Sequence, residues 1–251
     1  EYLVRVYNCI AYIYAFQYSP DSIQGYSQKS IDLFLSGYTV SEDEKAWAHN
    51  LRALYFSAIK DFPKEYLELK KAYSICRKSP IKPLYLTYIT HNLTLVQYEL
   101  DLFQNIASAF HGLEFDRIDF NKLPLVGKES YVRCLFFLAE ACVFTRSFDM
   151  GIYYLEKVNK LAPSLGGSIA PIYLYKYHGA KGFLFFEQKD YRQALREKLK
   201  SLVFFKNVEG GYRKGWELND LPAIGSKLGA PTVSTTITVI YPLSHNTYGK
   251  N

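Results

Sequence analysis

Small and aromatic residues recur at fixed offsets along the chain, and this pattern predicts pairs of helices joined by short turns. The clearest unit spans residues 182–195, where an apolar segment is followed by a polar turn and a second segment with helical spacing. Gly182 and Ala194 are small enough to let two helices approach closely, while Phe185 and Tyr191 fill the space between them. We therefore expect a helical hairpin in this part of the chain.

The same offsets recur upstream, with matches that weaken towards the N-terminus. In 131–163 the small positions are taken by Ala139 and Gly151, and Pro163 closes the unit as a helix stop signal. Three further units keep the register at 86–113, 46–78 and 3–34. The units begin near residues 4, 46, 87, 132 and 175, so the period is about 42 residues.

The unit at 182–195 resembles the tetratricopeptide repeat, which places a small residue, an aromatic, Asp-Tyr at the turn and then Ala in this order. The resemblance covers residues 2–207 and departs at Lys181, where the family usually has Leu, and in a period longer than the usual 34 or so. It implies an all-α, right-handed α-solenoid of about five hairpins over 1–207. Helical hairpins of similar period outside this family are the alternative.

Residues 208–251 have a different character, and we expect an irregular extension there. Gly210 and Gly211 break the last helix, and 232–241 is β-branched and partly alternating, which predicts one strand. An isolated strand needs a partner. This segment is therefore an edge for a further domain, a segment docked on the repeats, or sequence foreign to the natural protein.

Stacked units of the tetratricopeptide kind create a concave surface that is lined by the first helix of each hairpin. On this surface we expect the candidate ligand-binding or partner-binding residues Arg5, Asn8, Tyr12, Asn50, His91, Asn92, Tyr98, Arg133, Phe136, Glu140, Lys176 and Phe183.

Three of these residues, Asn8, Asn50 and Asn92, follow one another at intervals of 42 residues. A carboxamide offers both a donor and an acceptor, so a row of them can hold an extended peptide by its backbone. Alternatively, Asn recurs because it caps or bridges helices. Later units have Cys134 and Lys176 at this position, so the row is incomplete.

Charge adds little to this interpretation. Arg5, Arg133 and Lys176 either clamp acidic groups of a ligand or extend along helix surfaces with their charged ends in water. The net charge is +6 over 251 residues, and the basic stretches 70–82 and 192–206 lack aromatics interleaved on the same face. Nucleic-acid binding through this region is therefore not expected, and solvated helix faces are the expected role.

The sequence predicts neither catalysis nor a cofactor. The five histidines form no metal-binding sequence motif, and the sequence contains no phosphate-binding loop or nucleophile elbow. The four cysteines include no CxxC pair and lie in apolar helical contexts, which favours reduced thiols, no metal and a cytoplasmic location. No apolar run is long enough to span a membrane.

These observations predict a protein-binding or peptide-binding scaffold or receptor rather than an enzyme. Long repeats with asparagines along the groove are similar to the ligand-sensing part of bacterial peptide-responsive regulators, which often carry a DNA-binding domain ahead of the repeats. Since the chain begins inside an expected helix, we expect it to be part of a longer protein. The alternative is a regulatory or sensor segment of a larger multidomain enzyme or effector complex. The oligomeric state stays open.

Overall fold

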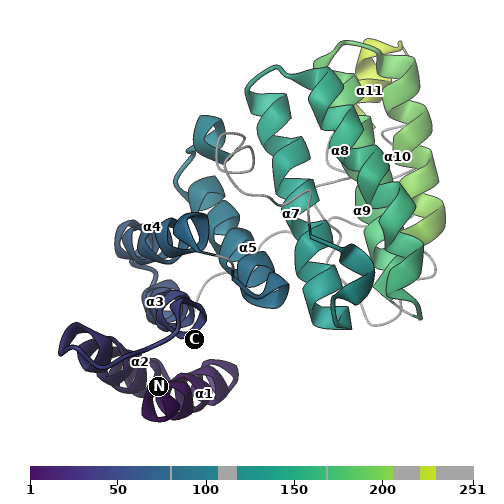
Figure 1. Ribbon diagram of the computed structural model, residues 1–251. Helices are drawn as coiled ribbons and strands as arrows, with labels where there is room; N and C mark the ends of the chain where they lie inside the picture. The colour runs from purple at the N-terminus through teal and green to yellow at the C-terminus, as the bar shows by residue number, and fades with distance from the viewer. Residues whose placement is uncertain (80, 107–117, 168, 206–220, 230–251) are drawn as a thin grey trace. The chain divides into compact units, whose positions relative to one another are not determined.

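A computed structural model describes residues 1–79, 81–106, 118–167, 169–205 and 221–229, and these residues are helical with no strand among them. The expected all-α class is thereby confirmed for the described part of the chain (Figure 1). The helices are α1 (Tyr2–Phe16), α2 (Pro20–Leu35), α3 (Glu42–Ala58), α4 (Phe62–Lys78), α5 (Pro83–Glu99), η2 (Phe120–Lys122), α7 (Leu125–Phe144), α8 (Phe148–Leu161), η3 (Ala162–Leu165), α9 (Ile169–Glu187), α10 (Tyr191–Phe205) and α11 (Leu221–Lys227).

The chain divides into two compact units, Glu1–Thr145 and Arg146–Asn251. In the first unit α1 pairs with α2 and α3 pairs with α4, and the pairs stack through contacts of α2 with α3 and of α4 with α5. In the second unit α9 pairs with α10, and α8 packs against α9. Helices that are neighbours in sequence are thus neighbours in space, as a repeat pattern predicts.

The turns inside the hairpins repeat with the interval that the sequence predicts. Each first helix is followed, two residues after its end, by a non-glycine residue with φ between 52° and 64°. These residues are Tyr18, Lys60, Asp101, Arg146 and Lys189. They lie at intervals of 41 to 45 residues, and each follows the expected start of its unit by 14 residues.

At four of these turns the next residue closes the helix end with a backbone hydrogen bond. Its N–H donates to the carbonyl five residues earlier, as in Asp61 to Phe56 and Asp190 to Phe185, both at 2.9 Å. A left-handed residue with this bond is a Schellman motif, which satisfies carbonyls that a helix end leaves unpaired. One turn geometry thus recurs along the chain.

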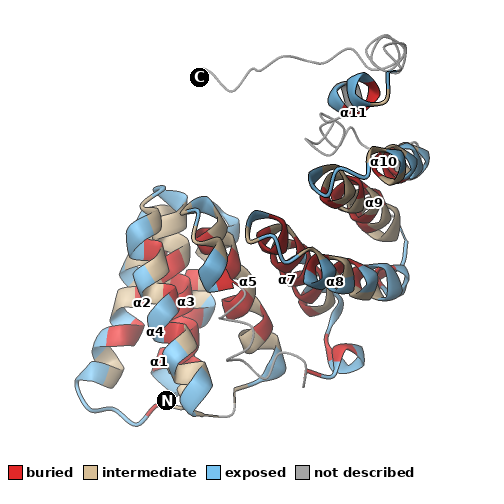
Figure 2. Cartoon of the chain, turned by 90° about the horizontal axis from the view of Figure 1, so that it is seen from above, coloured by how far each residue is buried: buried red, intermediate tan, exposed pale blue. Residues whose placement is uncertain are grey.

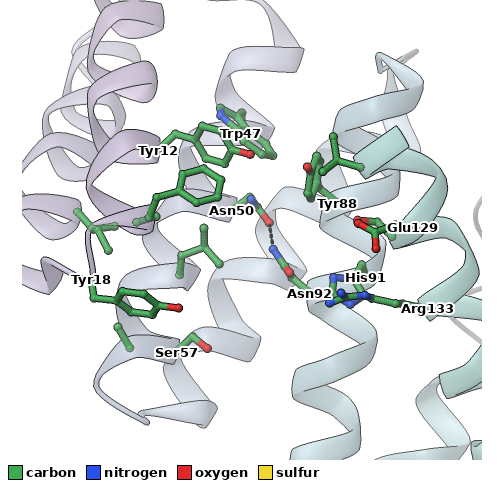
Figure 3. A pocket seen from close by; sticks show the side chains of 17 residues that line it. Tyr12, Tyr18, Trp47, Asn50, Ser57, Tyr88, His91, Asn92, Glu129 and Arg133 are labelled. Carbon is green, nitrogen blue, oxygen red and sulfur yellow. Dashed lines mark hydrogen bonds between the residues drawn. The ribbon is translucent and has the colours of Figure 1, made fainter. Parts of the chain in front are cut away.

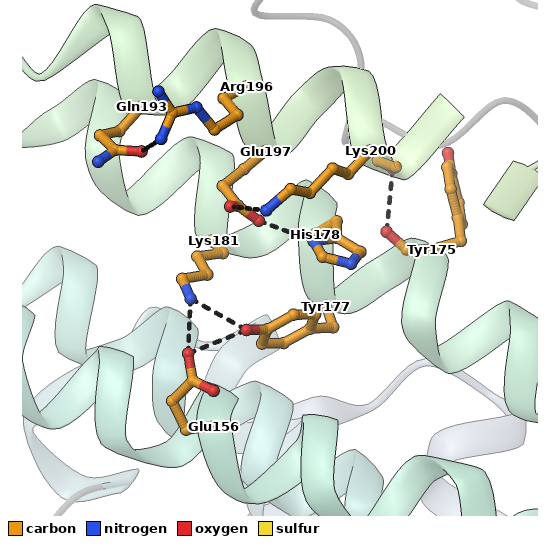
Figure 4. Close-up of polar contacts among 10 residues, drawn as sticks. Glu156, Tyr175, Tyr177, His178, Lys181, Gln193, Arg196, Glu197 and Lys200 are labelled. Carbon is orange, nitrogen blue, oxygen red and sulfur yellow. Dashed lines mark hydrogen bonds and ion pairs between the residues drawn. The ribbon is translucent and has the colours of Figure 1, made fainter. Parts of the chain in front are cut away.

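Side-chain contacts across the hairpins repeat as well. In two hairpins a histidine of the first helix bonds through Nδ1 to a glutamate Oε2 of the second helix at 2.7 Å, and a lysine three residues further on binds the same carboxylate. The two sets are His49, Glu68 and Lys71, and His178, Glu197 and Lys200. Figure 4 shows the second set. Burial raises the pKa of Glu197, but the hydrogen bonds from Lys200 and His178 outweigh it and hold this pKa below its usual value.

The second unit also shows why a small residue is needed in the first helix. A Cβ added to Gly182 would lie 2.8 Å from Cγ of Lys198, whose side chain is fully buried between α9 and α10. The equivalent positions of the first two hairpins are occupied by Ala11 and Ala53, both buried. The small residues noted in the sequence therefore lie where two helices approach closely.

Lys181, where the sequence departs from the tetratricopeptide pattern, has a polar role in the structure. Its ammonium group donates to Glu156 of α8 and, at 3.0 Å, to the hydroxyl of Tyr177 (Figure 4). Tyr177 also donates to Glu156 at 2.9 Å. A leucine at this position would lose the link between α8 and α9.

The C-terminal region holds one element that the sequence analysis did not anticipate. α11 packs against α10, and its Ile224 is fully buried. The nearby proline and glycines suggested an irregular segment, but a proline in the first turn of a helix removes no intrahelical hydrogen bond. The expected strand at 232–241 and residues 107–113 of the expected unit at 86–113 lie outside the described residues.

Replacing Lys60 with glycine should stabilise the fold. The left-handed backbone at this position is strained for a residue with a Cβ, and glycine adopts it freely, so Lys60→Gly should raise the free energy of unfolding by roughly 0.5–1 kcal/mol. The matched control is Lys70→Gly inside α4, which should cost about 1 kcal/mol. Urea denaturation measures both, and a loss of stability in Lys60→Gly would contradict the assigned turn.

Replacing Gly182 with leucine should destabilise the second unit. The added side chain meets the buried stem of Lys198, so we expect a loss of roughly 1–3 kcal/mol. Gly25 in α2 has open space around its Cα, so Gly25→Leu should instead be neutral or mildly stabilising in the same thermal melts. Equal effects of the two substitutions would mean that α9 and α10 do not approach as described.

Candidate functional site

A cavity of about 680 Å³ opens in the first unit and is the candidate functional site (Figure 3). Most of its wall comes from first helices of successive hairpins, α1, α3 and α5, together with α7. The lining residues are Tyr12, Ala15, Phe16, Tyr18, Ile23, Trp47, Asn50, Leu54, Ser57, Ala58, Tyr88, His91, Asn92, Val126, Glu129, Ser130 and Arg133.

Helical spacing explains how each element contributes to this wall. On α3 the lining residues Trp47, Asn50, Leu54 and Ser57 recur every three or four positions, which places them on one face of the helix. α3 packs against α1, α2, α4 and α5, so its buried positions continue behind this face (Figure 2). A rigid, well-packed helix therefore carries the centre of the site.

Aromatic rings form one side of the cavity around Trp47. The indole is 7% exposed and stacks on Tyr85 with ring centroids 4.7 Å apart and an interplanar angle of 11°. Tyr88 meets it edge-on at 5.8 Å, and Tyr12 lies 5.6 Å away and contacts Phe16 at 4.8 Å. Such rings supply a large apolar surface with polar tips.

A chain of hydrogen bonds crosses the centre of the cavity. Nδ2 of Asn92 donates to Oδ1 of Asn50 at 2.8 Å, and His91 shares a hydrogen bond with the side chain of Asn92. Asn50 is completely buried, and among the described residues its Nδ2 has no hydrogen-bond partner. In Figure 3 this nitrogen lies at the end of the amide opposite the bond to Asn92. The chain therefore ends in a buried polar atom that is left unsatisfied.

Two titratable side chains of α5 that line the cavity, His91 and Tyr88, have shifted pKa values. Burial and, to a smaller extent, the positive charge of Arg133 lower the pKa of His91 to about 4, whereas the hydrogen bond with Asn92 works in the opposite direction. His91 is therefore neutral at pH 7. Burial also raises the pKa of the Tyr88 phenol, as do a hydrogen bond with Tyr12 and the charge of Glu129, while Arg133 opposes them.

Asn8 lies outside the cavity, although it continues the row of asparagines in the sequence. It is buried, and its Nδ2 donates to the backbone carbonyl of Glu44 at 3.1 Å and to the carboxylate of Glu44 at 2.8 Å. Asn8 thus bridges α1 to α3, and Asn92 bridges α5 to α3 through Asn50. The sequence analysis expected each amide of the row to pair with a peptide through both its donor and its acceptor. The bridges already use Asn50 Oδ1 and Asn92 Nδ2, so such pairing would require these bonds to break.

The structure brings five of the candidate residues to the cavity: Tyr12, Asn50, His91, Asn92 and Arg133. Arg5 is exposed on α1 and does not line it. Tyr98 belongs to an aromatic cluster with Phe103, Phe137 and Phe144. On α7, Phe136 is buried and Glu140 half-buried, and Lys176 and Phe183 belong to α9 of the second unit.

Sequence reasoning missed most of the other lining residues, among them Trp47, Tyr88 and Glu129. A signal for them was present, since Trp47 precedes Asn50 by one helical turn, Tyr88 precedes Asn92 by one turn, and Glu129 does the same for Arg133. The equivalence of repeat positions directed attention to the asparagines and away from their neighbours on the same face.

Several other chemistries have no counterpart in the described part of the chain. Its His, Cys, Asp and Glu side chains form no group of three that could hold a metal ion, and its helices include none suited to crossing a membrane. The four cysteines are free, with Cys134 and Cys142 buried, and burial raises the pKa of Cys142 to about 11.

The pKa of His91 gives a direct test of the cavity's charge arrangement. Removing the nearby positive charge in Arg133→Gln should raise this pKa from about 4 towards 6.5, measured by NMR from the imidazole protons. Lys70→Gln on α4 removes the same charge outside the cavity and should leave the pKa unchanged. Between pH 6.5 and 4 the unfolded chain binds more protons at His91 than the folded chain does. In the wild type, the contribution of His91 to the free energy of unfolding should therefore fall as the pH falls.

No protein-family model matches this chain, and no curated protein matches it as a relative. The interpretation of the cavity therefore depends on its geometry and chemistry.

Proposed function

We propose that the chain is a tetratricopeptide-like, right-handed helical repeat that binds an extended peptide, or an extended segment of a partner protein, in the cavity of its first unit. The observation that carries this proposal is the unpartnered Nδ2 of Asn50, which among the described residues has no hydrogen-bond partner and is buried in the wall of a large and mainly apolar cavity. In this role the chain is a scaffold or receptor and performs no reaction itself.

The unsatisfied amide favours a ligand with a hydrogen-bond acceptor. A buried donor without a partner costs about 1–3 kcal/mol, and a ligand carbonyl placed against Asn50 would recover that energy. Three described residues have a buried, unpaired side-chain atom, namely Asn8, Asn50 and Gln97, and of these only Asn50 lines the cavity. The acceptor is therefore expected at one defined point of the ligand.

The surrounding wall favours a ligand that also carries an apolar group. The rings of Tyr12, Phe16 and Trp47 are next to Asn50 in the cavity, so an aliphatic or aromatic side chain can pack there while the backbone carbonyl meets the amide. A volume of about 680 Å³ lies within the usual range for ligand pockets. A short peptide stretch meets both requirements.

The histidine of the site suits binding better than proton transfer. His91 is hydrogen-bonded to Asn92 and its pKa is about 4, far below the value near 7 that suits a general base at neutral pH. We therefore assign His91 to fixing the orientation of Asn92, and through it the orientation of Asn50. We further propose that the chain is the ligand-sensing part of a peptide-responsive regulator in the cytoplasm, a reducing compartment in which its four free cysteines would stay reduced.

Selection from a random peptide library tests the proposal and identifies the ligand class at the same time. Wild-type protein is used for selection, and Ala58→Trp for counter-selection, because Ala58 is an exposed residue of the cavity wall whose enlargement fills the cavity without removing a hydrogen bond. Peptides that bind the wild type and not Ala58→Trp support the proposal. If no selected peptide distinguishes the two proteins, the cavity is not a peptide site.

For a peptide selected in this way, Asn50→Ala should weaken binding by roughly 1–3 kcal/mol, or about 5-fold to 150-fold in Kd. The loss of the bond to Asn92 also affects folding, so the melting temperature is measured alongside the Kd by titration of Trp47 fluorescence. Leu67→Ala on the exposed face of α4 is the control and should change neither quantity. A purely structural role for Asn50 would lower the melting temperature and leave the Kd of the folded fraction unchanged.

A further inference from the structure

Glu129 of α7 is a half-buried carboxylate in the cavity wall, and it forms no ion pair or hydrogen bond with another described residue. The other charged side chain of the wall is Arg133, one helical turn further along α7, but no ion pair joins the two. Glu129 therefore presents to the cavity a negative charge that no described residue pairs.

A ligand that fills the cavity removes water from Glu129. A carboxylate that loses its water without gaining a hydrogen-bonded partner is strongly disfavoured. An uncharged ligand would bind against this loss, and an acidic ligand would in addition be repelled. A ligand with a positive charge at this point replaces the lost water with charge-assisted hydrogen bonds.

The Glu129 carboxylate lies on the aromatic side of the cavity. Burial, a hydrogen bond with Tyr12 and then the charge of Glu129 raise the pKa of the Tyr88 phenol, and the effect of Glu129 exceeds the opposing effect of Arg133. In the view of Figure 3 the carboxylate lies between Tyr88 and the pair formed by His91 and Arg133. The negative charge is therefore next to the rings, whereas the positive charge is beside the histidine.

Three rings, which we call the cavity rings, line the wall on this side: Tyr12, Trp47 and Tyr88. The centroids of Tyr12 and Tyr88 lie 5.6 Å and 5.8 Å from that of Trp47, with interplanar angles of 59° and 62°. The rings are thus inclined to one another and do not form a flat stack. The faces of tryptophan and tyrosine rings attract ammonium groups, most strongly where water is excluded.

Other aromatic rings of the first unit receive a cation from the chain itself. The guanidinium of Arg52 lies 5.3 Å from the ring centroid of Phe56, and Nζ of Lys82 lies 5.4 Å from that of Tyr85. In the described part of the chain, no lysine or arginine lies in this way over one of the cavity rings. These rings are therefore available to a cation of the ligand.

We propose that the ligand of this cavity carries an ammonium group, which lies between the Glu129 carboxylate and the cavity rings while a ligand carbonyl accepts from Asn50. This inference rests on the proposed function and specifies the class of peptide. The ammonium group is either the N-terminal amine of the peptide or the side chain of a lysine, because both present the same charge and the same hydrogen-bond donors.

Four synthetic hexapeptide libraries, all without arginine, test the proposal. The N-terminus is free or acetylated, and in each case lysine is either included or replaced by norleucine. Selection uses the wild type, with counter-selection against Ala58→Trp. Peptides that bind only the wild type should come from libraries with an ammonium group and not from the acetylated norleucine library. The free norleucine library and the acetylated lysine library then distinguish the N-terminal amine from the lysine side chain.

The possible failures of this selection are distinguishable. If the acetylated norleucine library yields cavity-dependent peptides with the same affinity as the other libraries, the ammonium group is not required. That result would overturn the present inference and leave the cavity as a peptide site. If none of the four libraries yields a cavity-dependent peptide, the proposed function fails and this inference fails with it.

Glu129→Gln tests the contact itself with a selected peptide and its uncharged version, in which the amine is acetylated or lysine is replaced by norleucine. The substitution should raise the Kd of the charged peptide roughly 10-fold or more, and should leave the Kd of the uncharged version nearly unchanged. Glu99→Gln removes an exposed carboxylate of α5 outside the cavity and should change neither Kd.

The melting temperature of Glu129→Gln should equal that of the wild type, because the carboxylate has no described partner to lose. An equal loss of affinity for the charged and uncharged peptides would mean that Glu129 acts on the shape of the cavity and does not contact an ammonium group. An unchanged Kd of the charged peptide would contradict the proposal as well.

Discussion

The structure depends on one constraint, which is that a pair of helices has an apolar face that it cannot cover alone. In the first unit α3 and α5 meet this requirement along one repeated face. α3 receives the preceding hairpin there through Glu44 and Leu51, and α5 does so through Ile89 and Asn92. The turn inside the hairpin repeats together with this face, and at four of these turns the first helix ends in a Schellman motif.

Polar residues on this repeated face give the first unit its candidate site. Asn8 and Asn92 bridge successive first helices, and burying their amides is favourable only because each donates to a partner across the seam. Next to the cavity the bonding is incomplete, since Nδ2 of Asn50 has no partner among the described residues. Three described residues keep an unpaired buried side-chain atom, namely Asn8, Asn50 and Gln97, and of these Asn50 lines the cavity. Neutral His91 is hydrogen-bonded to the side chain of Asn92. We infer that this bond orients the Asn92 amide, which in turn donates to Asn50.

The sequence predicted the parts of the fold that depend on local spacing. Small residues such as Gly182 and the turn aromatics located the hairpins, and the left-handed residues from Tyr18 to Lys189 confirm the interval. Contacts between distant residues were not predictable in this way. The row of asparagines indicated one function for all three, whereas their partners differ, because Glu44 faces Asn8 and the cavity faces Asn50. Trp47 and Tyr88 were missed because their position depends on how α1, α3 and α5 stack. α11 depends on its contact with α10, which its proline and glycines did not reveal.

The central claim is that Asn50 offers a hydrogen-bond donor to a ligand in the cavity. The most direct measurement is the NMR signal of the Asn50 side-chain amide protons, with and without a peptide selected for binding the cavity. The account predicts that one Nδ2 proton of Asn50 shifts downfield on binding, while the bond from Asn92 to Asn50 is retained. Unchanged Asn50 signals, with the shifts confined to other residues, would contradict it.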